Sequence, residues 1–207
     1  MKGSPLANAT IDQITFANGC MILTADPTRS VSLVEAMRAG GVERIEAEET
    51  ASPSMLTQMR YSAYTHSAIF VEVRVDEELG VLRVTRIVNA VAAGKILNPK
   101  TARSQVLGGI VWGMSMALHE ETFTDHNLGR FMNHNLAEYH VPVNADVHDI
   151  EVIFVEERDD KASPIGVKGL GEIGIVGTPA AIANAICHAT GKRIRDLPIT
   201  IDKVLSD

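Results

Sequence analysis

One acidic residue, Glu172, lies in a run of the chain that otherwise holds glycines, apolar and small residues and a single lysine. Residues 164–178 contain five glycines and no second acid. Glycines allow a backbone to turn tightly and to come within contact distance of a bound group. Apolar neighbours leave a carboxylate little water, so that it holds a proton more readily, as a general base near neutral pH must. This pattern predicts an active site with Glu172 as its base; the alternative is a glycine-rich turn whose glutamate faces solvent.

A helix is expected to follow this run. Thr178 is a residue type that caps helices, Pro179 fits the first helical position, and the alanine-rich segment after it ends before Gly191. A glycine-rich loop that leads into a helix presents unpaired N–H groups, a setting in which anions bind readily. A helix that only packs in the core is the simpler interpretation of this segment, and an anion-binding cradle beside the base is the alternative.

A second candidate group lies on a helix expected over residues 101–121. Gln105 stands near its start, where a side-chain amide can donate and accept hydrogen bonds. Gly108, Gly109 and Gly113 lie inside this helix, and each interior glycine costs about 1 kcal/mol relative to alanine. The concentration of glycines predicts that something approaches the helix closely. Another helix or strand is the simpler interpretation, and a flat cofactor is the alternative.

Both strands and helices are expected to position these residues. Turn signals at Asn18-Gly19 and over residues 76–80 predict two β-hairpins. Interleaved strands and helices predict an α+β fold with mixed sheets and packed helices. We expect a small N-terminal segment, residues 1–60, and a main domain, residues 61–207. The expected strands are residues 11–16, 20–24, 68–75, 81–91 and 150–156.

Composition limits the classes of protein that the chain can belong to. Its 207 residues are 45% hydrophobic and 22% charged, which is enough apolar material for a buried core. The net charge of −7 argues against nonspecific binding of nucleic acid. No run approaches about 18 consecutive apolar residues and residues 1–9 lack the core of a secretory signal, so we expect no membrane span and a cytoplasmic location. Cys20, Cys187 and the histidines show no metal-ligand spacing, so a protein-ligated metal is not expected.

Several motifs follow one another in a fixed order between about residue 60 and the end of the chain. They include Asn-Pro-Lys-Thr-Ala-Arg-Ser-Gln at 98–105, Asn-His-Asn-Leu-Ala-Glu-Tyr-His at 133–140 and Lys-Gly-Leu-Gly-Glu at 168–172. This series resembles the C-terminal part of the molybdenum-binding large subunit of the xanthine dehydrogenase and aldehyde oxidase family. The resemblance is strongest to the bacterial three-subunit aldehyde oxidases.

The resemblance implies a cofactor and a reaction. The cofactor is a molybdenum ion held by a pterin dithiolene, in bacterial members usually the cytosine dinucleotide form, with no metal ligand from the protein. Glu172 would take a proton from a molybdenum-bound hydroxyl, so that the oxygen can attack an aldehyde or N-heterocycle with water as the oxygen source. Gln105 would form hydrogen bonds near the metal centre, and the strip from Lys168 would line the pterin. The cofactor-binding residues that the resemblance implies are Gln105, Gly108, Gly109, Lys168, Gly169, Leu170 and Gly171.

The resemblance also implies partners, because electrons that reach molybdenum must leave. Relatives pass them to an iron–sulfur subunit and often to an FAD subunit, which a chain with two cysteines cannot replace. The family's large subunits are several times longer, so we expect a fragment that is inactive alone and is completed by a missing N-terminal half. An uncovered apolar face could drive formation of a homo-oligomer, and export to the periplasm with a partner subunit is an alternative to the cytoplasm.

Two sequence features bear on the substrate and on the alternatives. Xanthine-oxidising relatives have a second glutamine at the position of Trp112 and prolines at Ile173-Gly174, so the resemblance favours aldehydes over purines. A non-enzymatic binding or assembly domain that keeps the family fold is the alternative to an enzyme. A phosphate-binding glycine loop is disfavoured, because the chain lacks the lysine and hydroxyl arrangement of a nucleotide loop.

Overall fold

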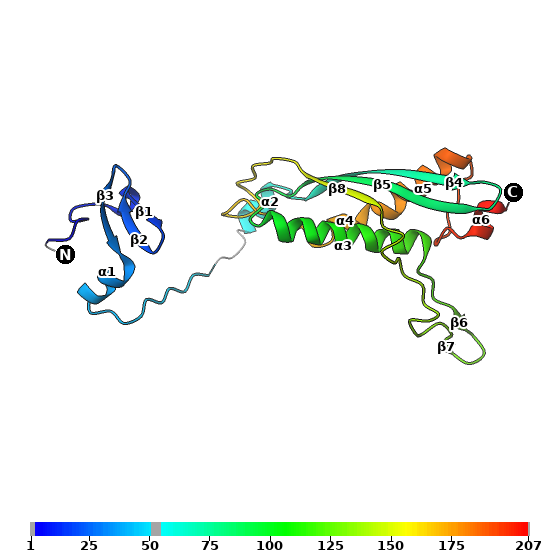
Figure 1. The fold of residues 1–207 in the computed structure, drawn as a ribbon, viewed down its shortest axis with the longest axis horizontal. Helices are drawn as coiled ribbons and strands as arrows, with labels where there is room; N and C mark the ends of the chain where they lie inside the picture. The colour runs from blue at the N-terminus through cyan, green and yellow to red at the C-terminus, as the bar shows by residue number, and fades with distance from the viewer. Residues whose placement is uncertain (1–2, 51–54, 207) are drawn as a thin grey trace. The chain divides into compact units, whose positions relative to one another are not determined.

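The computed structural model describes residues 3–50 and 55–206. The chain divides into two compact units, Met1–Ser52 and Pro53–Asp207, whose elements are labelled in Figure 1. The expected boundary after residue 60 lies a few residues later than this division, because helix α2 (Met55–Arg60) falls in the second unit.

The first unit is a small antiparallel sheet with one short helix. Its strands pair in the order β1 (Ile14–Ala17), β2 (Cys20–Leu23) and β3 (Asp26–Ser32). The predicted hairpin turn is confirmed, since β1 and β2 are joined by Asn18-Gly19 and both residues have positive φ, 51° and 73°. The remaining elements are the 3-10 turn η1 (Ile11–Gln13) and α1 (Leu33–Ala39). Among the described residues of this unit, Leu23 is the single buried hydrophobic residue, so its own core is very small.

The second unit is built on a mixed three-stranded sheet. Strands β4 (His66–Asp76) and β5 (Val81–Ala92) form the second predicted hairpin, and β8 (Asp149–Phe154) pairs with β5 in parallel. Exposure alternates along β4, so that one face is wet and the other packs, as the sequence pattern predicts. The expected α+β class with mixed sheets is therefore confirmed.

Helices pack on the inner face of this sheet. Helix α3 (Pro99–Leu118) runs along the sheet (Figure 1), begins at the cap residue Asn98 and ends three residues earlier than expected. It ends there because the N–H groups of His119 and Glu120 both bond to the carbonyl of Ser115. Helix α5 (Thr178–Thr190) packs against both α3 and β4. The buried core includes Ile87, Val91, Val106, Ile110, Met114, Ile182 and Ile186.

The structure corrects the predicted start of α5. A short helix, α4 (Ile173–Val176), precedes it, and the residue before α5 is Gly177, so Thr178 is not the cap. Thr178 is instead fully buried, and its hydroxyl donates to the carbonyl of Gly174 at 2.7 Å. Thr178 and Pro179 at the start of α5 are both buried, which agrees with a packing role for this end of the helix and leaves these two residues closed to an anion.

The remaining elements of the second unit lie near the C-terminal end of α3 (Figure 1). A hairpin projects from the body of the second unit beyond the end of α3 (Figure 1). Its strands, β6 (Thr124–Asp125) and β7 (Arg130–Phe131), have two residues each. Helix α6 (Ile201–Leu205) packs against Gly80 in the β4–β5 turn.

One stretch passes a length and composition test for a membrane-crossing helix, contrary to the expectation from the sequence. It spans Ile173–Thr190, with a mean hydropathy of 1.3 over 18 residues. Core helices of soluble proteins pass the same test, so this is weak evidence. In the structure the stretch is divided between α4 and α5, and Ile182 and Ile186 from it are buried in the core.

Candidate functional site

Glu172 lies immediately before α4 and its side chain is exposed. The expectation of a carboxylate with little water around it is therefore wrong for this chain by itself. The physical reason is the packing of its neighbours. Leu170 and Ile173 pack against the core, and Gly174 is buried against α3, so the residue between them is left on the outside. Its role as a base stays a prediction.

Gln105 is joined to the residue that precedes Glu172. The side-chain Nε2 of Gln105 donates a hydrogen bond to the carbonyl oxygen of Gly171 at 2.8 Å. The structure thus brings together two candidates that lie 66 residues apart in the chain. This bond ties the glycine strip to the first turns of α3 at the position of the carboxylate.

Two of the three glycines in α3 serve close packing. A Cβ atom on Gly109 would come within 3.1 Å of the backbone of Gly174, and one on Gly113 would come within 2.6 Å of the Thr178 side chain. The simpler interpretation of these two positions, contact with another helix, is therefore confirmed. Gly109 faces α4 and Gly113 faces α5.

The third glycine of α3 faces open space, as do two glycines of the strip. A Cβ atom on Gly108, Gly169 or Gly171 would meet nothing of this chain within 4 Å, and all three residues are exposed. Gly108 is one helical turn from Gln105, which holds Gly171. Bare backbone of this kind leaves room that side chains would otherwise fill, so these residues fit a flat group such as a pterin.

Lys168 is placed differently from the glycines that follow it. Its ammonium group lies 2.6 Å from a carboxylate oxygen of Glu157 and 3.1 Å from one of Asp159, and it donates to the carbonyl of Tyr64. The side chain is only 7% exposed. The N–H of Lys168 bonds to the carbonyl of Ala93. The ammonium group and the backbone N–H of Lys168 therefore both have partners within this chain. Leu170 anchors the strip in a different way, by packing against the core.

The electrostatics of this ion-pair group are mutually supportive. The hydrogen bond with Glu157 is the main cause that raises the pKa of Lys168, and the same bond is the main cause that lowers the pKa of Glu157. The pKa of Asp159 is lowered, first by the N–H groups of Ala162 and Lys161 and then by Lys168. All three groups are thus held in their charged forms.

Three further residues hold the strip or the lysine before it, and the sequence did not predict them. Thr65 donates its hydroxyl proton to the carbonyl of Gly169 at 2.5 Å, and Glu157 and Asp159 bind Lys168. Nothing local in the sequence marks Thr65. The acidic run at 156–160 is a visible signal, but its partner at 168 is set by the tertiary fold.

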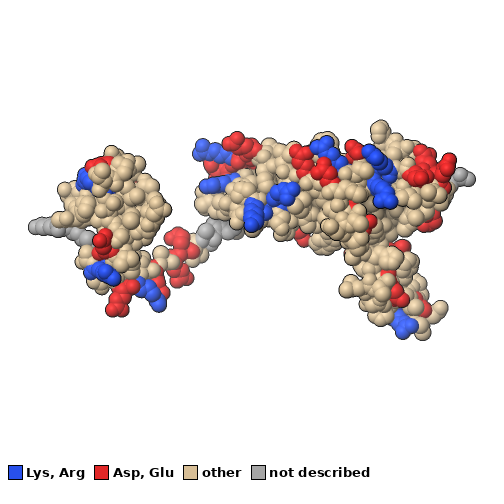
Figure 2. Space-filling model, viewed as in Figure 1, with Lys and Arg blue, Asp and Glu red and all other residues tan. Residues whose placement is uncertain are grey.

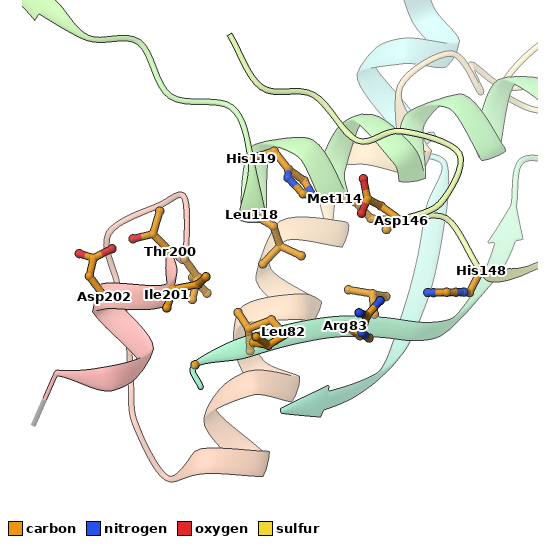
Figure 3. A pocket seen from close by; sticks show the side chains of 14 residues that line it. Leu82, Arg83, Met114, Leu118, His119, Asp146, His148, Thr200, Ile201 and Asp202 are labelled. Carbon is orange, nitrogen blue, oxygen red and sulfur yellow. The ribbon is translucent and has the colours of Figure 1, made fainter. Parts of the chain in front are cut away.

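A cavity of about 480 Å³ lies elsewhere, at the opposite end of α3 (Figure 3). It contains none of the predicted site residues. Around it lie Leu82 and Arg83 from β5, Met114 from α3, and His119 with His148 from the following segments. Within the described part of the chain, no three His, Cys, Asp or Glu side chains gather in a way that could hold a metal ion.

The chain is similar to molybdenum-binding proteins over most of its length. The family model for the molybdopterin cofactor-binding domain matches residues 2–148. The aldehyde oxidoreductase molybdenum-binding subunit PaoC of Escherichia coli (strain K12) is 48% identical over 194 residues, 94% of this chain and 26% of that protein. The putative xanthine dehydrogenase molybdenum-binding subunit XdhA of the same strain is 41% identical over 63% of this chain and 17% of its own length. The chain spans about a quarter of the length of PaoC.

Solved structures give the same picture of the fold. The aldehyde oxidoreductase from Desulfovibrio desulfuricans ATCC 27774 has a TM-score of 0.61 at 31% identity, over 68% of this chain and 15% of that one. Quinoline 2-oxidoreductase from Pseudomonas putida 86 has a TM-score of 0.75 at 21% identity, over 97% of this chain and 26% of that one. At that lower identity the second likeness shows the fold alone.

Proposed function

This chain belongs to the xanthine dehydrogenase and aldehyde oxidase family of molybdenum-binding subunits, and from that premise we propose that it builds one side of a molybdenum hydroxylase active site. The enzyme would oxidise an aldehyde or an N-heterocycle with water as the oxygen donor. The observation that carries the proposal is the exposed backbone strip. Two observations support it: Gly108, Gly169 and Gly171 face open space, and Gln105 bonds to Gly171, the residue before Glu172.

The cofactor would be molybdenum bound to molybdopterin, in the cytosine dinucleotide form. When bound, it supplies the redox chemistry. The chain's own residues supply position and a proton acceptor. Gln105 fixes the carbonyl of Gly171, the open glycines give the pterin a wall without side chains, and the carboxylate of Glu172 accepts the proton that water loses when its oxygen attacks the substrate carbon.

Aldehydes are the favoured substrate class. Trp112 stands where a second glutamine of purine-oxidising relatives would be expected, and its ring is exposed on α3. A ring cannot offer the paired donor and acceptor of an amide to a purine. The relation to a subunit named as an aldehyde oxidoreductase supports the same choice.

A general base in this site would need to be shielded from water, so the exposed Glu172 would have to be covered by another segment or chain. On the face drawn in Figure 2, charged side chains of both signs are interspersed with wide uncharged areas. We propose that further polypeptide of the large subunit covers such areas, and that iron–sulfur and FAD subunits carry the electrons away in the cytoplasm. Large apolar side chains that are exposed on and after α3 support this: Trp112, Met116, Phe123, Phe131 and Leu136.

The exposure of Glu172 also favours a second candidate, a binding or assembly domain without catalysis. The two candidates differ in molybdenum content and in the effect of removing the carboxylate. The chain is purified alone and together with the proteins encoded beside it, and its molybdenum and pterin are measured. Absence of both from every sample would support the binding domain.

The variant Glu172→Gln in the assembled enzyme tests the role of the base. Turnover is expected to fall by at least the ~10²-fold that a lost general base typically causes, with molybdenum content unchanged. Glu77→Gln, at an exposed glutamate in the β4–β5 turn, is the matched control and should keep normal turnover. Near-normal turnover of Glu172→Gln at full molybdenum loading would refute the assignment.

A further inference from the structure

A nearly buried cation lies directly before the exposed glycine strip. The side chain of Lys168 is 7% exposed, and those of Glu157 and Asp159 are 28% and 17% exposed. A cation that is withdrawn from water is stable only when it is paired and hydrogen-bonded. The two carboxylates and the carbonyl of Tyr64 provide these partners.

The partners of Lys168 come from separate parts of the fold. Tyr64 precedes β4, whereas Glu157 and Asp159 follow β8. The second carboxylate oxygen of Glu157 accepts from the N–H of Gly94, just after β5, at 2.8 Å. One lysine therefore holds together the segments that leave or enter all three strands of the sheet.

The backbone around Lys168 is fixed by the same segments. The N–H of Lys168 bonds to the carbonyl of Ala93, and the N–H of Lys95 bonds to the carbonyl of Gly166 at 2.7 Å. Gly94 and Val167 form an isolated antiparallel bridge. The strip is thus attached to the end of β5 immediately before it opens to solvent.

We propose that Lys168 is a positioning residue of the site: its ion pairs with Glu157 and Asp159 fix one end of the backbone strip 169–171, and Gln105 fixes the other. This inference rests on the proposed function for its link to the cofactor. Lys168 then acts through the strip that it holds, and its ammonium group does not contact the pterin. Because both ion pairs are made within this chain, the strip would be ordered in advance of binding.

The neighbouring residues offer a matched control. Arg158 and Asp160 also form an ion pair in the same segment, but their side chains are 87% and 64% exposed. Exposed pairs contribute little, whereas removal of one partner from a buried pair leaves an uncompensated charge. Arg158→Gln should therefore leave the strip unchanged.

Amide hydrogen exchange of the full 207-residue chain tests the positioning role without cofactor. In Lys168→Met, exchange at the N–H groups of Lys95 and residue 168 should speed up by at least ~10-fold, while the amides of α3 keep their protection. Lys168→Arg should restore most of the protection. If Lys168→Met does not fold, the milder variant Glu157→Gln is used in its place. In that variant exchange should speed up first at the N–H of Gly94, which bonds to Glu157. Unchanged exchange in both variants would overturn the proposal.

The second measurement links the ordered strip to the cofactor. Pterin and molybdenum content of the assembled enzyme should fall in Lys168→Met and recover in Lys168→Arg. Loss of amide protection with full cofactor content would overturn the link between the ion pairs and the site. Absence of cofactor from the unaltered protein would overturn the proposed function instead, and the exchange result would still decide whether Lys168 fixes the strip.

Discussion

Gly109 of α3 and Gly174 of α4 are in backbone contact. A Cβ atom on Gly109 would lie 3.1 Å from the Cα atom of Gly174, and a Cβ atom on Gly174 would lie 2.6 Å from the carbonyl oxygen of Val106. Because Glu172 is the residue before α4, this contact sets how near the carboxylate lies to α3. The geometry of the site therefore depends on having no side chain at Gly109 or Gly174, as well as on the side chains that are present.

Gly174→Ala should destabilise the second unit. Its methyl group would meet backbone atoms of α3, which cannot move aside as a flexible side chain can. We expect a loss of about 1–3 kcal/mol in the free energy of unfolding, the usual range for overpacking. Urea unfolding of the chain measures it. An unchanged midpoint would mean that α4 can move away from α3 at little cost.

Gly108→Ala should act in the opposite direction. This glycine lies in the middle of α3 and faces open space, so alanine should raise the free energy of unfolding by up to about 1 kcal/mol through helix propensity alone. In the assembled enzyme the added methyl group would enter the room proposed for the pterin, and cofactor content should fall. A variant that is more stable and still fully loaded would argue against a pterin at Gly108.

Much of the fold could be predicted from the sequence, because its signals are local. The alternation of residues along β4 and the turn at Asn18-Gly19 depend only on neighbouring residues, and both predictions are confirmed. Helix α4 was missed because four residues with a glycine among them have weak helix propensity, and the segment is held by its contact with α3.

The candidate site was less predictable, because it depends on contacts between distant segments. Gln105 was singled out on its own, but its bond to Gly171 joins residues 66 positions apart. The same holds for Lys168, whose carboxylate partners follow β8. The water-poor surroundings expected for Glu172 were inferred from apolar neighbours in sequence, but two of these neighbours, Leu170 and Ile173, pack against the core instead.

Acid should weaken the attachment of the strip, because its ion pairs depend on the carboxylates of Glu157 and Asp159. The pKa values of Glu157 and Asp159 are lowered in the folded protein, so their contribution to stability is complete above the ordinary carboxyl pKa of about 4 and is lost as pH falls through the lowered values. The raised pKa of Lys168 has the opposite sign, so that its contribution is complete below its ordinary value of about 10 and is lost as the pH rises through the raised value. Between these limits the stabilisation should be constant.

The acid limb of this profile can be assigned with two variants. The unfolding temperature is measured in steps from about pH 6 down to about pH 2, the range in which carboxylates titrate. Asp159→Asn should fall less steeply than the unaltered chain, because it lacks one of the titrating groups. Asp160→Asn, at the exposed neighbour, should follow the unaltered profile. Equal slopes for both variants would show that Asp159 contributes nothing to acid sensitivity.

Asn89 provides a test of how the core itself is built. It lies on β5, next to Ile69 of β4 and Val152 of β8, and is fully buried. Its Nδ2 and Oδ1 atoms have no hydrogen-bond partner among the described residues. A buried amide without partners destabilises a protein by roughly 1–3 kcal/mol. Asn89→Val, which suits a buried strand, should therefore raise the unfolding temperature, whereas Asn89→Asp should lower it strongly by placing a charge in the core. A lower unfolding temperature for the valine variant would show that the amide has a partner, such as a buried water, and that its polarity supports the sheet beneath α3.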